Sequence, residues 1–485
     1  MLIIVPSSLL LVSASASSTK IDELYYHMLA PARFVLDCQL DFHQYPWQSA
    51  LPQMYFQIGM SPLHAVGTPH AGNVLSASIG IQLAVAIHRL LQSSLEDRFF
   101  ASLVAGLVLT GTHASVLYTT SGAHAVGDAC LVTVVLMLAY SASRREQISA
   151  WHAGLLLSTA ASTKVSLIPV AGMLSLLFLF RIHRTGPRTR RKYLEFAAPW
   201  LLVCVPNFFW TWIESGSPFG PLLAGRFGPS VYDVERIQEV LSSSRMKARQ
   251  FDAMLIQELA AFPLLFWFFV WRGLRHLCLG RREPFTPVVV FVFQLAVLSV
   301  ALPFAQRFLG GTQIALMVAG ALYCLPGVAA TRSHPKRIRR LLVLSVIPWL
   351  IGQMIYLHPF VLRGMMLTSQ QDFGRTYIPF YEDLLYLDRH LPDEATLFVT
   401  GVRPPSVYFP RPVIVHAFDD LGDASPLFIF ACDLSREEIR KRLPEAIQLT
   451  DVIWENTNSL KYASRIPGRP ARFGTVTVYS TKLRR

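Results

Sequence analysis

Charged side chains are scarce in this sequence, and acidic ones more so than basic ones. Of the 485 residues, 15% are charged, with 44 Lys and Arg against 31 Asp and Glu. A soluble globular protein carries about 25%. Hydrophobic residues make up 52% of the chain, and the mean hydropathy is +0.39. This balance excludes an ordinary cytosolic enzyme, a disordered scaffold and a collagen-like fibre, and it indicates a polytopic membrane protein.

Cysteine is also sparse. The six cysteines occur singly, several of them inside apolar runs, and no CxxC or paired spacing is present. The pattern therefore predicts neither a zinc site nor a disulfide framework. No metal ligand and no cofactor is assigned from the sequence, and a divalent cation stays an open alternative.

The net charge of +13 could in principle suit a nucleic acid, but that requires basic residues on one folded face. Here they form short clusters between apolar runs, at 144–145, 181–192, 272–282 and 332–340. Such clusters indicate loops on the cytoplasmic side of a membrane. We therefore expect the lipid bilayer, and no nucleic acid, as a partner.

Eleven apolar stretches approach the roughly 20 residues that a membrane-spanning helix needs. They are 2–17, 72–92, 99–119, 126–142, 148–163, 166–182, 196–213, 257–272, 286–304, 310–330 and 340–359. We interpret 148–182 as two short helices with Lys164 in the turn at the membrane surface. One long tilted helix with a snorkelling lysine is the alternative. The first stretch ends in small residues, as a signal peptide does. We expect instead that it is a membrane anchor and that the natural start of the chain lies upstream.

Two domains follow from this count. Residues 1–359 form a transmembrane domain whose first outer loop, 18–71, holds an amphipathic helix at 22–37 in the membrane interface. An odd number of spans places 360–485 outside, as a small extracytoplasmic α/β domain. We predict a helix at 381–391 and strands at 396–400, 412–416, 426–431, 452–454 and 475–479. Ser435 and Glu438 have capping-box spacing before a helix at 439–443.

The first outer loop begins with candidate catalytic residues. Asp22 and Glu23 stand next to one another, and His27 follows four or five residues later, on an overlapping helix face. Carboxylates at a membrane surface can acquire a raised pKa and act as a general base. A solvated helix start, where the dipole favours acids, is the alternative.

Three further ionisable residues stand at the outer ends of apolar spans. Asp128 begins the fourth span, where an acid is costly and usually functional, although it could simply cap the helix. Lys164 and Arg307 could bind an anionic group such as a phosphate; ordinary interfacial anchoring is the alternative.

Trp212 belongs to an aromatic segment, 207–221, that runs into a turn rich in Gly and Pro. Such a turn could shape a sugar-binding cleft. An aromatic belt followed by a helix stop is the alternative.

In their order along the chain, these segments resemble the GT-C glycosyltransferases, which include protein O-mannosyltransferases and bacterial aminoarabinose transferases. The similar pieces are 22–33, 51–55, Gly127-Asp128-Ala129, Ala160–Lys164, 207–221 and Arg307-Phe308-Leu309. Together with the α/β tail they cover most of the chain.

The resemblance implies a polytopic α-helical fold and an enzyme that moves a sugar from a polyprenyl-phosphate donor, with inversion, to a lipid, glycan or protein acceptor. It implies Asp22 as the base with Glu23 beside it, Asp128 as a second acid, and Lys164 and Arg307 as phosphate partners. The expected location is a bacterial cytoplasmic (inner) membrane, with the active site on the extracytoplasmic side. A transporter or lipid flippase, or a non-catalytic membrane protein, is the alternative; no internal repeat of the kind found in transporters is visible.

Overall fold

The fold is known from a computed structural model, which describes residues 1–16, 28, 31, 34–35, 54–66, 71–95, 97–120, 124–144, 149–185, 190–219, 225–228, 263–278, 310–330, 335–400, 413–415, 427–445, 447–462 and 471–483. The chain divides into two compact units. The first comprises Met1–Ala14, Gln48–Phe56 and Ala71–Leu357, and the second comprises Ser15–Trp47, Gln57–His70 and His358–Arg485.

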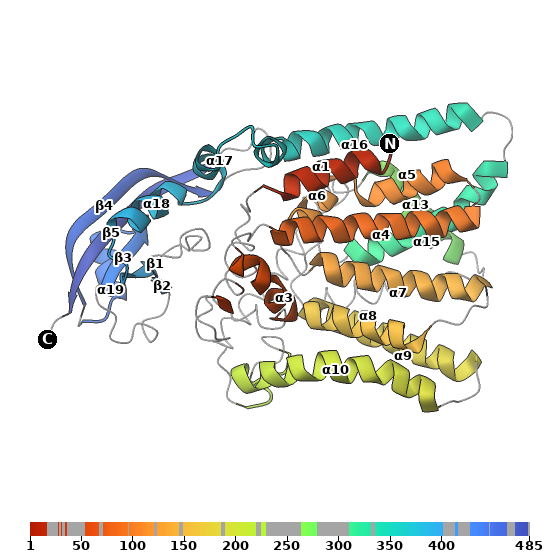
Figure 1. The fold of residues 1–485 in the computed structure, drawn as a ribbon, viewed down its shortest axis with the longest axis horizontal. Coiled ribbons are helices and arrows are strands. Elements are labelled where there is room, and N and C mark those ends of the chain that lie inside the picture. Colours follow the sequence, from red (N-terminus) through yellow and green to blue (C-terminus); the bar gives the residue numbers. More distant parts are fainter. Residues whose placement is uncertain are drawn as a thin grey trace. The chain divides into compact units, whose positions relative to one another are not determined.

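The first unit is helical, and most of its longer helices run side by side (Figure 1). Its described helices are α1 (Ile4–Ala14), α4 (Ala71–Leu95), α5 (Arg98–Val108), α6 (Thr112–Tyr118), α7 (His124–Arg144), α8 (Ala150–Thr163), α9 (Ile168–Thr185), α10 (Arg190–Ser215), α13 (Leu264–Cys278), α15 (Gly310–Ala330) and most of α16 (Pro335–Gly364). A helix α3 (Met54–Ala65) begins in this unit and continues in the second.

Among the described helices, three are long and apolar enough to cross a membrane: Ala71–Ser94, Arg190–Ser215 and Arg339–Gly364. Five shorter apolar helices lie within or near predicted spans: Ile4–Ala14, Arg98–Val108, Ala125–Leu138, Ile168–Phe180 and Gly311–Leu322. The predicted span 286–304 lies outside the described residues. The total of about eleven spans therefore stays a prediction.

The chain breaks at Lys164, as the sequence predicts. Lys164 has an extended backbone, with φ −158° and ψ 131°, and ends α8. A short 3-10 turn, Val165–Leu167, then leads into α9. The alternative of one long tilted helix over 148–182 is wrong.

The stretch 99–119, predicted as one span, is not one continuous helix, because the structure divides it into α5 and α6. Gly111, with a φ of 107°, reverses the backbone between them. Gln353 of α16 compensates for the broken helix: its Nε2 donates to the Leu109 carbonyl at 3.0 Å, and its Oε1 accepts from the Gly111 N–H at 3.4 Å. A distant polar side chain thus replaces hydrogen bonds that a continuous helix would make.

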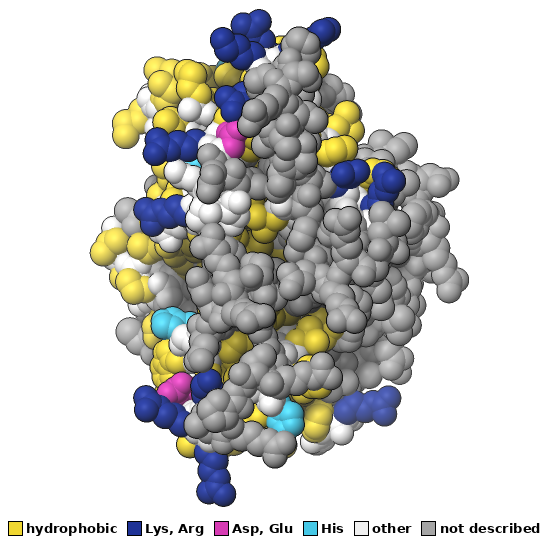
Figure 2. Space-filling model, turned by 90° about the vertical axis from the view of Figure 1, so that its right-hand side faces the viewer, with side chains coloured by type: hydrophobic (Ala, Val, Ile, Leu, Met, Phe, Trp, Pro, Cys, Tyr) yellow, Lys and Arg dark blue, Asp and Glu magenta, His cyan; other side chains and the backbone are white. Residues whose placement is uncertain are grey.

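Basic residues gather at one end of the helices of the first unit. Arg98, Arg190 and Lys336 are exposed in the first turns of α5, α10 and α16. Figure 2 views this end and shows Lys and Arg side chains around its rim, with few acidic ones. The basic segments described by the structure therefore share one end, and the assignment of that end to the cytoplasm stays a prediction.

The second unit contains a five-stranded sheet in the order β2-β1-β3-β5-β4 (blue in Figure 1). Its strands are β1 (Thr396–Thr400), β2 (Val413–Val415), β3 (Leu427–Cys432), β4 (Ile447–Tyr462) and β5 (Arg472–Leu483). Strand β1 pairs in parallel with β2 and β3, whereas β5 pairs antiparallel with β3 and β4. The α/β prediction is confirmed, but β4 and β5 are far longer than predicted.

Helices cover both faces of this sheet. The apolar side of α18 (Tyr381–His390) packs on Leu397, Phe430 and Val478, and Met28 of the first loop is buried in the same core. Ile439 of α19 (Arg436–Arg442) packs on the other face. The predicted capping box is present, since the Glu438 N–H donates to Ser435 Oγ and Glu438 Oε2 accepts from the Ser435 N–H.

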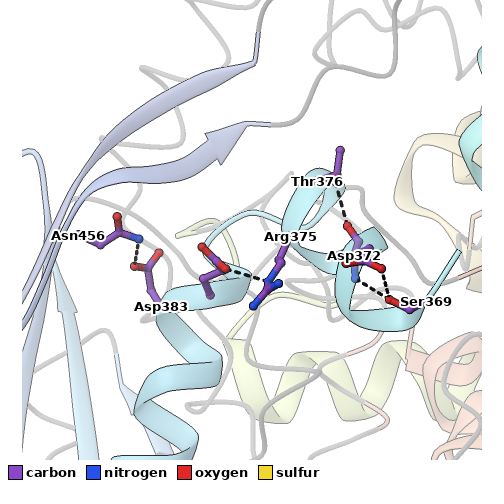
Figure 3. Close-up of polar contacts among 7 residues, drawn as sticks. Ser369, Asp372, Arg375, Thr376, Asp383 and Asn456 are labelled. Atoms are coloured by element: carbon purple, nitrogen blue, oxygen red, sulfur yellow. Dashed lines mark hydrogen bonds and ion pairs between the residues drawn. The ribbon is translucent and has the colours of Figure 1, made fainter.

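The buried Asp383 joins α18 to β4. One carboxylate oxygen accepts hydrogen bonds from Trp454 Nε1 (3.0 Å), Asn456 Nδ2 (2.8 Å) and Ser459 Oγ (2.9 Å). Figure 3 shows Asp383 facing Asn456 from the neighbouring helix. Burial raises the pKa of the Asp383 carboxyl, and the three hydrogen bonds oppose that rise.

Candidate functional site

Two of the predicted site residues, Asp128 and Lys164, come together where α7 begins and α8 ends. A Cβ on Gly127 would lie only 2.8 Å from Thr163 Oγ1, so the two helices touch at the residues that precede the acid and the lysine. Asp128 and Lys164 are 1% and 9% exposed, and their opposite charges attract one another. A buried acid and a buried cation that compensate each other are typical of a functional position in a membrane protein.

Asp128 is not the N-cap of α7. It is the fifth residue of that helix, whose first residue is His124. The capping alternative for this acid is therefore wrong.

The start of helix α15 packs against Asp128 at a glycine, Gly311. A Cβ on Gly311 would lie 3.0 Å from Asp128 Oδ1 and 3.2 Å from its Cα. The Gly311 N–H donates a hydrogen bond to the Asp128 carboxylate, as the free N–H groups of a helix start can do for an anion. The sequence does not predict Gly311 as a site residue; the only signal for it is the pair Gly310-Gly311 soon after Arg307.

Several buried polar atoms in this part of the first unit lack a partner. In the described structure, no hydrogen bond reaches Asp128 Oδ2, the Tyr118 hydroxyl, Ser76 Oγ or Gln313 Oε1. The Tyr118 ring lies against α4 so closely that a Cβ on Gly80 would be 2.6 Å from its Cδ1, and its hydroxyl is within electrostatic reach of Asp128. An unsatisfied buried polar group costs about 1–3 kcal/mol. Several of them together are expected where a ligand or water binds.

Further buried polar side chains form a strip between α8 and α10. Ser162 Oγ is 3.3 Å from Cys204 Sγ, and Cys204 Sγ donates to the Ser158 carbonyl at 3.4 Å. Asn207 lies about one turn further along α10, is 2% exposed, and has no partner for either amide atom in the described structure. The strip therefore continues toward the end of α8 that carries Lys164.

Trp212 lies on a different side of α10. Its side chain is 47% exposed, and its apolar neighbours Phe209 and Ile213 are 58% and 65% exposed, whereas Asn207 and Thr211 are buried. This placement near the end of an apolar helix suits the aromatic-belt alternative.

The remaining candidates lie outside the described residues: Asp22, Glu23, His27 and Arg307. Within the described part of the chain, no group of three or more His, Cys, Asp or Glu side chains could hold a metal ion. Since the two first-loop acids and His27 are not part of that set, the question of a divalent cation stays open.

No family model and no curated protein matches the sequence. Two solved structures of ArnT from Cupriavidus metallidurans are similar, each at 14% sequence identity. The one bound to undecaprenyl phosphate has a TM-score of 0.56, and the similarity covers 99% of this chain and 97% of that chain. The apo state has a TM-score of 0.55, with 98% and 97% covered. At this identity the similarity shows the fold: over nearly its whole length, this chain has a fold similar to that of ArnT.

Proposed function

We propose that the protein is a membrane glycosyltransferase that takes a sugar from a polyprenyl-phosphate donor. The observation that carries this proposal is that Asp128 and Lys164 are both buried where α7 begins and α8 ends, with Gly311 packed against Asp128. It occurs in a fold similar to that of ArnT, one structure of which is bound to undecaprenyl phosphate. A lysine at the end of an apolar helix, beside unsatisfied polar atoms, suits a phosphate that enters from the bilayer.

In the proposed reaction, the acceptor attacks the anomeric carbon of the sugar while the bond from that carbon to the phosphate oxygen breaks. Asp22, with Glu23 beside it, takes the proton of the acceptor, and direct displacement inverts the anomeric centre. The lipid phosphate leaves as an anion. Lys164 and Arg307 stabilise its charge as it develops, which is the largest contribution that such a site makes.

Asp128 acts on Lys164 in this proposal. A carboxylate within reach of the ammonium keeps it charged in an apolar surrounding and holds its direction. His27 is proposed to contact the substrate, whereas the exposed position of Trp212 on α10 suits the aromatic belt. The acceptor is a lipid, a glycan or a protein. We place the site and the second unit on the extracytoplasmic side of a bacterial cytoplasmic (inner) membrane.

The test uses purified full-length protein in liposomes, undecaprenyl-phosphate-linked sugars and a cell-envelope acceptor extract. Lys164→Met keeps the length of the side chain and removes its charge. It should lower transfer about 10²- to 10³-fold, as the loss of one charge-stabilising donor does, and Lys164→Arg should retain more activity. Lys336→Met, at the exposed basic end, is the matched control and should change nothing.

Other outcomes would redirect the proposal. Unchanged transfer in Asp22→Asn would exclude Asp22 as the base. Binding of undecaprenyl phosphate that depends on Lys164, without transfer from any donor, would instead favour a transporter or lipid flippase.

A further inference from the structure

Three consecutive apolar side chains project from the chain directly after α16. Met365, Met366 and Leu367 are 58%, 86% and 67% exposed. Single exposed apolar residues are common on protein surfaces, but three in succession form a patch that usually has a partner. We refer to Met365–Leu367 as the apolar tip.

The apolar tip is held in one conformation. The Met366 N–H donates to the Arg363 carbonyl at 2.9 Å, and the Leu367 N–H donates to the Leu362 carbonyl at 2.8 Å. From the same turn, Arg363 Nε donates to Gln370 Oε1, and its Nη1 donates to the Thr368 carbonyl, both at 3.0 Å. These four hydrogen bonds build a turn rather than a loose connection.

The backbone of this turn is strained at Met366. Its φ is 60°, in the left-handed region, which a non-glycine residue adopts only at a cost. Glycine would adopt the same backbone freely. A methionine at this position is therefore unfavourable for the backbone. Its apolar side chain is also exposed. Burial of that side chain in an apolar surrounding would offset the cost of the backbone conformation and of the exposure.

Helix α16 determines where the apolar tip lies in a bilayer. Its apolar part, Arg339–Gly364, has 26 residues, or about 39 Å of helix at 1.5 Å per residue. The hydrocarbon core is only about 30 Å thick. The end of α16 therefore reaches the layer of lipid headgroups, and the apolar tip follows at the next residue.

Beyond the turn, the chain becomes polar. Ser369 caps α17 (Gln370–Tyr377), where its Oγ accepts from the Asp372 N–H at 3.0 Å (Figure 3). The apolar tip is thus the last apolar projection between a membrane-spanning helix and a polar helix.

We propose that Met365–Leu367 insert into the interfacial layer of the bilayer and contact phospholipid acyl chains near the headgroups. Methionine suits this surrounding because its unbranched, polarizable side chain adapts to irregular neighbours. The guanidinium of Arg363, at the base of the turn, would then lie at the depth of the phospholipid phosphates. The contact would fix the point at which the chain leaves the membrane, and it does not depend on the transfer reaction.

The test places a photocrosslinking amino acid, p-benzoyl-phenylalanine, at position 367 of the full chain in liposomes of phosphatidylethanolamine and phosphatidylglycerol. After illumination, mass spectrometry should find phospholipid adducts on the peptide that contains residue 367. The matched control carries the same amino acid in place of Lys441 on α19, whose side chain is 72% exposed, and should give none. Absence of lipid adducts at 367, or equal yields at both positions, would overturn the proposal. Crosslinked dimers instead of lipid adducts would overturn it in favour of a second copy of the chain.

A second variant separates the apolar side chain from the turn. Met366→Gly suits the left-handed backbone and removes the side chain, so the turn should persist while lipid adducts at position 367 fall several-fold. Met366→Leu should retain the adducts. An unchanged yield in Met366→Gly would show that the methionine does not anchor the turn.

Discussion

Gly311 lies so close to Asp128 that a Cβ on the glycine would be 3.0 Å from Asp128 Oδ1. Backbone atoms of α7 limit the space as well, because the same Cβ would be 3.2 Å from Asp128 Cα. A side chain at position 311 would therefore require α15 or Asp128 to move by a few tenths of an ångström.

Gly311→Ala should accordingly displace α15 or turn Asp128 away from its hydrogen bond. Overpacking of this kind costs about 1–3 kcal/mol. We expect a lower thermal stability and a lower transfer rate from the liposome assay. The matched control is Gly172→Ala on α9, where nothing lies within 4 Å of the added Cβ. It should be neutral or slightly stabilising, because alanine favours a helix more than glycine does. Equal effects of both substitutions would contradict a close contact.

Gln353→Leu should destabilise the first unit. The substitution removes the amide of Gln353 on α16, which is the hydrogen-bond partner of the Leu109 carbonyl and the Gly111 N–H. Each buried group that loses its partner costs about 1–3 kcal/mol. Thermal unfolding in detergent, followed by circular dichroism, measures the loss. Met354→Leu, on the exposed side of the same helix, should change little. A Gln353→Leu protein as stable as the parent would show that the break at Gly111 does not need the glutamine.

Asp97→Ala should destabilise the basic end. Asp97 Oδ1 accepts from the Phe99 and Phe100 N–H groups as the N-cap of α5, and Oδ2 accepts from Arg339 Nη2 at 2.8 Å. Loss of the cap costs about 1 kcal/mol, whereas the half-exposed ion pair adds little. Asp97→Asn keeps a capping oxygen and should therefore cost less. Glu195→Ala breaks an equally short but exposed pair with Arg191. The same thermal-unfolding measurement should detect no change there, and a loss as large as that of Asp97→Ala would contradict the capping argument.

Asp383 should make the second unit more stable at mildly acidic pH than at neutral pH. Burial raises the pKa of this carboxyl in the folded state, so the charged form is disfavoured by folding. Stability is then gained as the pH falls through the raised pKa and lost as it rises. Hydrogen exchange of the β4 amides at several pH values measures this, and Asp383→Asn should remove this contribution to the pH dependence.

Asp383→Ala should be more damaging than the amide variant, because three donors on β4 would lose their acceptor. We expect a cost of about 3 kcal/mol in the same exchange experiment. Asp388→Ala, exposed on the same helix, is the control. A similar result for the two alanine variants would contradict the role of Asp383 as the link between α18 and β4.

Features that depend on neighbouring residues could be predicted from the sequence. Apolar runs marked most of the helices of the first unit, the polar triplet at Ser162–Lys164 marked the break between α8 and α9, and Ser435 with Glu438 marked the start of α19. Hydropathy patterns, turn residues and helix caps each depend on a few neighbouring positions, so they can be recognised in the sequence. The resemblance to the GT-C glycosyltransferases depends on the order of such features, and the two ArnT structures have a fold similar to that of this chain.

Contacts between residues that are distant in the sequence could not be predicted and are evident only in the folded protein. Gln353 compensates for the break at Leu109, 244 positions away in the chain, and this is why an apparently continuous apolar run becomes two helices. Gly311 reaches Asp128 from another helix, and neither residue predicts the other. Strands β4 and β5 extend through polar residues because they pair with each other along most of their length. Such contacts depend on packing and on hydrogen bonds between remote segments, whose free energies no local pattern contains.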